Sequence, residues 1–149
     1  MPILRVRDDH TAALAGIHAQ GGELLEQIQD VLDQSKLSGP LERLLMTTAV
    51  RRETLLLDIE RLERERGDLP KAANIERALF EAIADWVKTR LTDESSLIRR
   101  LTEAETHWRQ NTLNAMELDW TDQEQDVLQG LIEHSDEFID ELAVLQTTH

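Results

Sequence analysis

Apolar residues recur at alternate spacings of three and four along four segments of about 25 residues each, and this pattern constrains the fold most. The spacing places apolar side chains in one row along a helix that packs nearly parallel to a neighbour. We therefore predict long helices over residues 9–34, 40–66, 93–118 and 122–146. Because helices of equal length favour antiparallel packing, the sequence predicts an all-α, antiparallel four-helix bundle.

Local signals mark the ends of these helices. Pro40 follows Ser38 and Gly39, and proline fits the first turn of a helix. Residues 67–70, Gly-Asp-Leu-Pro, interrupt the pattern after the second segment. Thr121 and Glu124 have the spacing of a capping box. We expect residues 1–149 to form a single domain, since the length suits one hydrophobic core.

A shorter helix is predicted over residues 73–91, between the second and third long helices. One of its faces is a wide apolar stripe made of Ile75, Leu79, Ala82, Ile83, Trp86 and Val87. Such a stripe requires a surface to cover. Two interpretations stay open, a crossover helix lying across the bundle and a helix that forms a subunit interface.

The formal net charge of −14 restricts the classes of partner. Nucleic-acid binding requires a basic face, so nucleic acid is not expected as a partner, and an anionic membrane surface is not expected for the same reason. An acidic surface keeps a protein soluble, and it also attracts cations and basic proteins. We expect either an unknown protein partner or self-association.

The chain contains no cysteine, which excludes disulfides, zinc ribbons, iron–sulfur clusters and thiol nucleophiles. No apolar run approaches the length of roughly 20 residues that a membrane span needs. The first residues lack an apolar stretch of signal-peptide length. The sequence therefore predicts a cytoplasmic location.

Polar or small residues interrupt the apolar rows near the middle of each long helix: Gly21, Arg52, Glu105 and Ser135. In an antiparallel bundle of equal helices these midpoints lie at one level, where Arg52 and Glu105 would pair and Gly21 would make room for them. One interpretation is a buried ion pair that fixes the helix register. A second is a metal or small-ligand site, and a third is a different register without such a layer.

The metal site would use Glu105 and His134 together with Glu53 or Glu26. A di-iron bundle usually carries two Glu-x-x-His pairs, and this chain has none. His134 precedes Glu137 in the reversed order, and the charge of Arg52 would oppose a cation. We expect no cofactor, with iron or another divalent metal as the alternative. Glycine-rich phosphate loops and nucleophile motifs are absent too, so no enzymatic activity is expected.

Four stretches of the sequence carry a resemblance to a known family. They are Gly21, residues 52–59, the run 79–86 that leads to residues 91–93, and Ala104 with Glu105. In these features the chain resembles the bacterial domain of unknown function 2383 family. The resemblance implies a ferritin-like four-helix bundle with a long connection between the second and third helices, and it implies no known activity. The chain departs from the family at two positions: Thr102 stands where the family pattern has an acid, and Ser135 stands where it has a histidine.

Together these features predict a non-enzymatic helical bundle that works through its surface, as an interaction or stress-associated protein. The alternative is a ferritin-like metal-binding protein or oxidase with an irregular site at mid-bundle. An obligate homo-oligomer that uses the helix over residues 73–91 is a third hypothesis.

Overall fold

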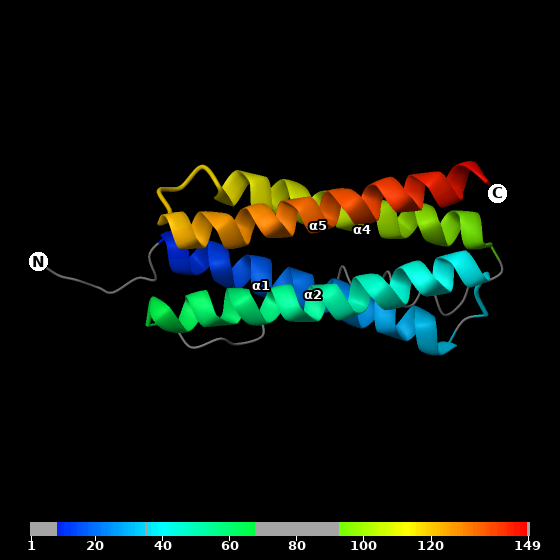
Figure 1. Cartoon of the computed structure of the whole chain (residues 1–149), viewed down its shortest axis with the longest axis horizontal. Coiled ribbons are helices and arrows are strands. Elements are labelled where there is room, and N and C mark those ends of the chain that lie inside the picture. Colours follow the sequence, from blue (N-terminus) through cyan, green and yellow to red (C-terminus); the bar gives the residue numbers. More distant parts are fainter. Residues whose placement is uncertain (1–8, 35, 68–92, 149) are drawn as a thin grey trace, which may run out of the picture.

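The computed structural model describes residues 9–34, 36–67 and 93–148, and these residues contain no strand. Over these residues it confirms the prediction of an all-α fold with four long helices (Figure 1). The helix predicted over residues 73–91 lies outside the described residues. The helices are α1 (Asp9–Gln34), α2 (Gly39–Glu65), α4 (Glu94–Ala115) and α5 (Asp122–Thr147).

The core of the bundle consists of two apolar clusters. The Trp108 cluster joins α1 up to Leu24, the second halves of α2 and α4 and the first half of α5: Leu14, Ile17, Leu24, Leu56, Ile59, Leu62, Trp108, Trp120, Leu128 and Leu131. The Phe138 cluster joins the opposite halves: Ile28, Val31, Leu41, Leu45, Leu97, Ile98, Leu101, Phe138 and Leu142. α1 and α5 therefore run in one direction, and α2 and α4 run in the other (Figure 1).

This arrangement divides the described chain into two antiparallel hairpins, α1–α2 and α4–α5 (Figure 1). Because α2 and α4 run the same way, α2 ends at one end of the bundle and α4 begins at the other (Figure 1). α2 has 27 residues, and at about 1.5 Å per residue it spans roughly 40 Å. The chain between Gly67 and Asp93 thus connects opposite ends of the bundle.

The ends of the helices lie close to their predicted positions, except at the end of α4. That helix stops at Ala115, whereas the sequence predicted its end at residue 118. The indole N–H of Trp120 donates to the carbonyl of Ala115 at 2.8 Å, and the backbone N–H of Leu118 bonds to the same oxygen at 3.1 Å. These bonds replace the next helical hydrogen bond, so the chain turns here toward α5.

The predicted capping box at the start of α5 is present. The hydroxyl of Thr121 accepts from the backbone N–H of Glu124, and the Glu124 carboxylate accepts from the backbone N–H of Thr121. Arg66, just after α2, donates to both carboxylate oxygens of Glu124 at 2.5 and 2.8 Å. These bonds from Arg66 lower the pKa of Glu124 to about 2, against the opposing effect of burial. The cap therefore also ties the two hairpins together.

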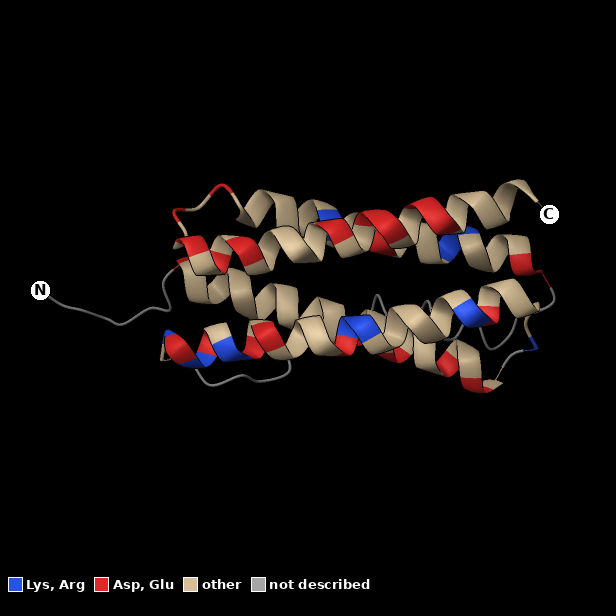
Figure 2. Cartoon of the chain, viewed as in Figure 1, with Lys and Arg blue, Asp and Glu red and all other residues tan. Residues whose placement is uncertain are grey.

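Charge is unevenly distributed over the helices. α1 and α5 contain acidic residues but neither lysine nor arginine, whereas α2 and α4 carry arginines. Figure 2 shows the acidic residues repeated along α5 and the arginines at the middle of α2. Over the ranges that the structure describes, no helix combines the length and apolar character needed to cross a membrane.

Candidate functional site

The side chain of Arg52 is fully buried at the middle of α2, between the two apolar clusters. Its Nη2 donates to Oε2 of Glu105 on α4 at 2.5 Å, and its Nε donates to Nε2 of His134 on α5 at 3.1 Å. The guanidinium carbon lies 4.5 Å from the centre of the Trp108 ring, a favourable cation–π distance. A buried charge is costly unless it is paired and hydrogen-bonded. These contacts supply a counter-ion and bonds for Nε and Nη2, while the buried Nη1 has no hydrogen-bond partner among the described residues.

Glu105 is the negative partner of this arginine and is only 1% exposed. Its Oε2 accepts a second hydrogen bond, from the hydroxyl of Ser135 on α5, at 2.5 Å. The structure thus brings together Arg52, Glu105 and Ser135 from three helices, at the level where the apolar rows of the sequence are interrupted. We refer to Arg52, Glu105, His134 and Ser135 as the polar layer.

Gly21 has a different role from the one expected. A Cβ atom at this position would lie 2.7 Å from Cζ2 of Trp108 and 2.8 Å from Cδ2 of Leu56. The glycine therefore makes room for the indole of Trp108, rather than for Arg52 and Glu105 themselves. The indole is anchored by a hydrogen bond of 3.0 Å from its N–H to the carbonyl of Ile17, and its ring then supports the guanidinium of Arg52.

His134 belongs to the polar layer as an acceptor. An arginine side chain stays protonated, so Nε2 of His134 must accept the bond from Arg52 and the proton of the neutral ring must sit on Nδ1. Burial, followed by the charges of Arg52 and Arg51, lowers the pKa of His134 to about 3. The imidazole is thus neutral throughout the physiological pH range.

The residues considered for a metal site do not converge. Glu26 on α1 and Glu53 on α2 are exposed, while Glu105 and His134 are both bound to Arg52. Glu53 directly follows Arg52, and a step of one residue turns a side chain about 100° around the helix axis. Within residues 9–34, 36–67 and 93–148, no group of three or more histidine or acidic side chains is placed to hold a metal ion.

A second buried carboxylate, Glu63 of α2, was not expected from the sequence. Its Oε1 lies 2.6 Å from Nδ1 of His18 on α1, and the Glu63 side chain is 1% exposed while that of His18 is 24% exposed. Glu63 follows Ile59 by four residues, so the helical spacing alone places it on the inward face of α2. The hydrogen bond that His18 donates to Glu63 raises the pKa of His18 against the opposing effect of burial, and the charges of Glu63 and Glu60 raise it further.

From the His18–Glu63 pair we predict that the stability of the fold depends on the charge of His18. A raised pKa in the folded protein stabilises the fold below the unfolded pKa of about 6.5, and the effect is lost as pH rises through the folded value. Urea denaturation between pH 6 and 9 should show a free energy of unfolding that falls by on the order of 1 kcal/mol. The fall should disappear in His18→Gln and persist in His107→Gln, which alters an exposed histidine. A pH dependence unchanged in His18→Gln would contradict the assignment.

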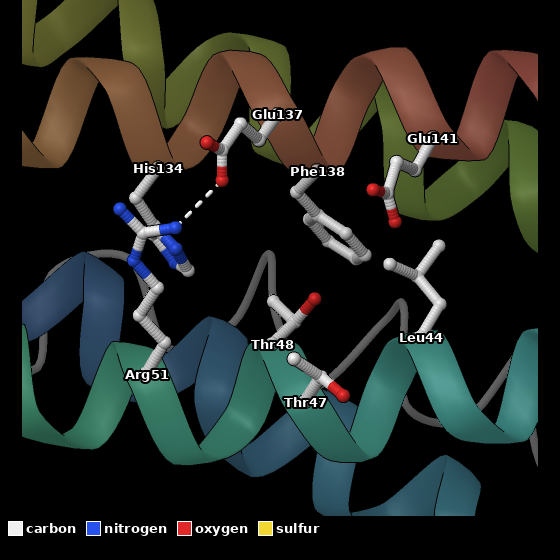
Figure 3. A pocket seen from close by; sticks show the side chains of 8 residues that line it. All are labelled: Leu44, Thr47, Thr48, Arg51, His134, Glu137, Phe138 and Glu141. Carbon is white, nitrogen blue, oxygen red and sulfur yellow. Dashed lines mark hydrogen bonds and ion pairs between the residues drawn. The ribbon is translucent and has the colours of Figure 1, made fainter.

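A small cavity of about 70 Å³ opens between α2 and α5, beside the polar layer. Thr48 is 5% exposed, its hydroxyl points toward α5 across the cavity (Figure 3), and it has no hydrogen bond with another described residue. Arg51 Nη1 and Glu137 Oε2 form an ion pair of 2.6 Å at the exposed edge. Figure 3 shows the eight lining residues, Leu44, Thr47, Thr48 and Arg51 from α2 and His134, Glu137, Phe138 and Glu141 from α5.

No family model, no curated protein and no solved structure matches this chain. The resemblance to the domain of unknown function 2383 family therefore stays a prediction from the sequence.

Proposed function

We propose that this protein is a non-enzymatic helical bundle that binds a basic partner through its acidic surface. The observation that carries this proposal is the guanidinium of Arg52, which takes the central position where bundle proteins place metal ligands on facing helices. The guanidinium is a built-in cation that pairs with the carboxylate of Glu105 and donates a hydrogen bond to the imidazole of His134. The bundle centre is then structural, and the surface is left to carry the function.

The contacts of the polar layer support the proposal that no metal ion binds there. Oε2 of Glu105 already accepts from both Arg52 and Ser135. The Nε2 lone pair of His134, which would otherwise bind a metal, accepts from Arg52 instead. A divalent cation entering here would have to displace the arginine and would be repelled by its charge.

We further propose that the bundle is ferritin-like, with a crossover helix within residues 73–91. The parallel directions of α2 and α4 support this, because such a bundle joins its second and third long helices through one long crossover connection. The sequence resemblance described above points the same way. It also favours a bacterial protein, and the expected location is the cytoplasm.

The acidic surface supports a basic protein partner over nucleic acid or a membrane surface. α1 and α5 present carboxylates without a lysine or arginine of their own, and phosphate groups would be repelled there. A protein with an interaction role, including a stress-associated one, fits this distribution. Self-association is the other way in which the surface would act, and the exposed apolar side chains Met46, Val50 and Leu57 on α2 are where it would begin.

The test compares iron with a basic peptide on protein purified without chelator. We expect bound metal well below one equivalent, no iron oxidation after Fe(II) is added to the apo protein, and salt-sensitive binding of a lysine-rich peptide by titration calorimetry. A glutamate-rich peptide of equal length is the control, and light scattering at each concentration detects self-association. Stoichiometric iron with oxidase activity, or equal binding of both peptides, would overturn the proposal.

A further inference from the structure

The cavity between α2 and α5 contains one carboxylate, that of Glu141, with no charged partner among the described residues. Of its three charged lining residues, Arg51 and Glu137 neutralise each other in an ion pair of 2.6 Å. Glu141 makes no ion pair with a described residue and is exposed at the same edge. Figure 3 shows its carboxylate beside Phe138, above Leu44. The net charge of the lining is therefore negative.

The inner wall of the cavity adds no charge to this balance. The His134 ring is neutral, and the charge of Arg52 behind it is matched by Glu105 at 2.5 Å. The surrounding surface strengthens the negative potential, because α5 contains no lysine or arginine. A cationic group is thus favoured at the cavity over an anionic one.

The size and shape of the cavity restrict the cation to a small one. Its volume of about 70 Å³ is roughly half that of the 150 Å³ cavity that holds benzene in another protein, so it accepts only a few heavy atoms. Leu44 and Phe138 provide an apolar wall for a methylene group, and an aromatic ring attracts a cation. The hydroxyl of Thr48 offers a buried hydrogen-bond acceptor beneath them.

We propose that this cavity binds the primary ammonium group of an aliphatic amine, with Glu141 as its charge partner and Thr48 as its buried hydrogen-bond acceptor. This inference rests on the proposed function and gives the basic partner a specific point of attachment. The same group occurs at the tip of a lysine side chain and in free aliphatic amines. Both present a methylene and an ammonium to the cavity in the same way.

The direct test is a titration of the full-length protein with n-butylammonium chloride, followed by backbone and His134 ring signals in NMR spectra. We expect saturable shifts at Thr48, His134 and Glu141, with a dissociation constant on the order of millimolar for so small a ligand. Tetramethylammonium carries the same charge without N–H donors and is the control. Equal shifts with both salts would mean general cation attraction and would overturn the proposal.

Three variants separate this site from the acidic surface as a whole. Glu141→Gln and Thr48→Val should each weaken butylammonium binding about fivefold, whereas Glu133→Gln, an exposed acid elsewhere on α5, should leave it unchanged. Thr48→Val keeps the side-chain volume, so it does not endanger the fold. Equal losses in Glu141→Gln and Glu133→Gln would contradict a specific site.

The affinities of the Arg51→Gln variant test whether the cavity prefers a cationic or an anionic ligand. The substitution removes the positive charge that pairs with Glu137. The cavity then becomes more negative, so the affinity for ammonium should rise about fivefold. A small carboxylate ligand would lose affinity in the same variant, and acetate serves as the comparison. Tighter acetate binding than butylammonium binding to the unaltered protein would refute the assignment.

The source of the ammonium group is decided by the lysine-rich peptide used above and its N-acetylated form. A peptide that binds more tightly than butylammonium, loses affinity on acetylation and depends on Glu141 identifies a lysine of a partner chain. Butylammonium binding without a gain from the peptide identifies a free amine. Peptide binding that is indifferent to Glu141→Gln leaves the proposed function intact and overturns this site.

Discussion

Replacing Arg52 with leucine should lower the free energy of unfolding by about 3–5 kcal/mol, because the change leaves the charge of Glu105 buried without its counter-ion. The double variant Arg52→Leu/Glu105→Leu should recover much of that loss, since it removes both charges. A residual loss of about 1–3 kcal/mol is expected because Nε2 of the buried His134 then lacks its donor.

Urea denaturation of the four proteins of this double-mutant cycle measures the coupling. Arg51→Leu is the matched control, because it alters the neighbouring arginine in an exposed ion pair with Glu137. Such a pair contributes no more than about 1 kcal/mol. Strict additivity of the changes at Arg52 and Glu105 would show that the two residues do not interact.

Gly21→Ala and Gly22→Ala should change stability in opposite directions. A methyl group on Gly21 meets Trp108 at 2.7 Å and Leu56 at 2.8 Å, whereas one on Gly22 meets nothing within 4 Å. The indole is rigid and held by its bond to the Ile17 carbonyl, so it cannot move aside as a flexible side chain would. We expect a loss of about 1–3 kcal/mol for Gly21→Ala and a gain of up to about 1 kcal/mol for Gly22→Ala.

Thermal and urea unfolding of the two variants measure this difference, and the tryptophan fluorescence, to which Trp108 contributes, reports on the packing. The emission should change in Gly21→Ala, whose new methyl group displaces the indole from its position against Arg52. It should stay the same in Gly22→Ala. Equal effects of the two substitutions on stability would show that Trp108 does not fill the space beside Gly21.

The position of the polar layer was predictable because helix geometry is regular. Arg52, Glu105 and Ser135 each interrupt an apolar row near the middle of a helix, and antiparallel helices of equal length bring their midpoints to one level. His134 was found only as a neighbour of Ser135 and as a possible metal ligand. Which of its nitrogens faces Arg52 depends on the rotation of α5 and on its side-chain rotamer, and periodicity specifies neither.

Other features depend on contacts between residues that are distant in sequence. Trp108 of α4 fills the space beside Gly21 of α1. The sequence pattern does not indicate which large side chain lies against this glycine. The pair His18–Glu63 joins α1 to α2 in the same way. The early end of α4 depends on the indole of Trp120 turning back onto Ala115, a side-chain contact that no capping rule anticipates.

Through Arg52 the polar layer joins the two hairpins of the chain, and through the bond from Ser135 to Glu105 it also joins α4 to α5 within one of them. Arg52 comes from the α1–α2 hairpin, while Glu105, His134 and Ser135 all come from the α4–α5 hairpin. The two halves of this protein therefore recognise each other through complementary buried charge, as two separate subunits do at an interface. If one hairpin slid along the other by a helical turn, Arg52 would be buried against apolar side chains without its counter-ion. The free-energy cost of that unpaired charge disfavours incorrect assembly of the two halves.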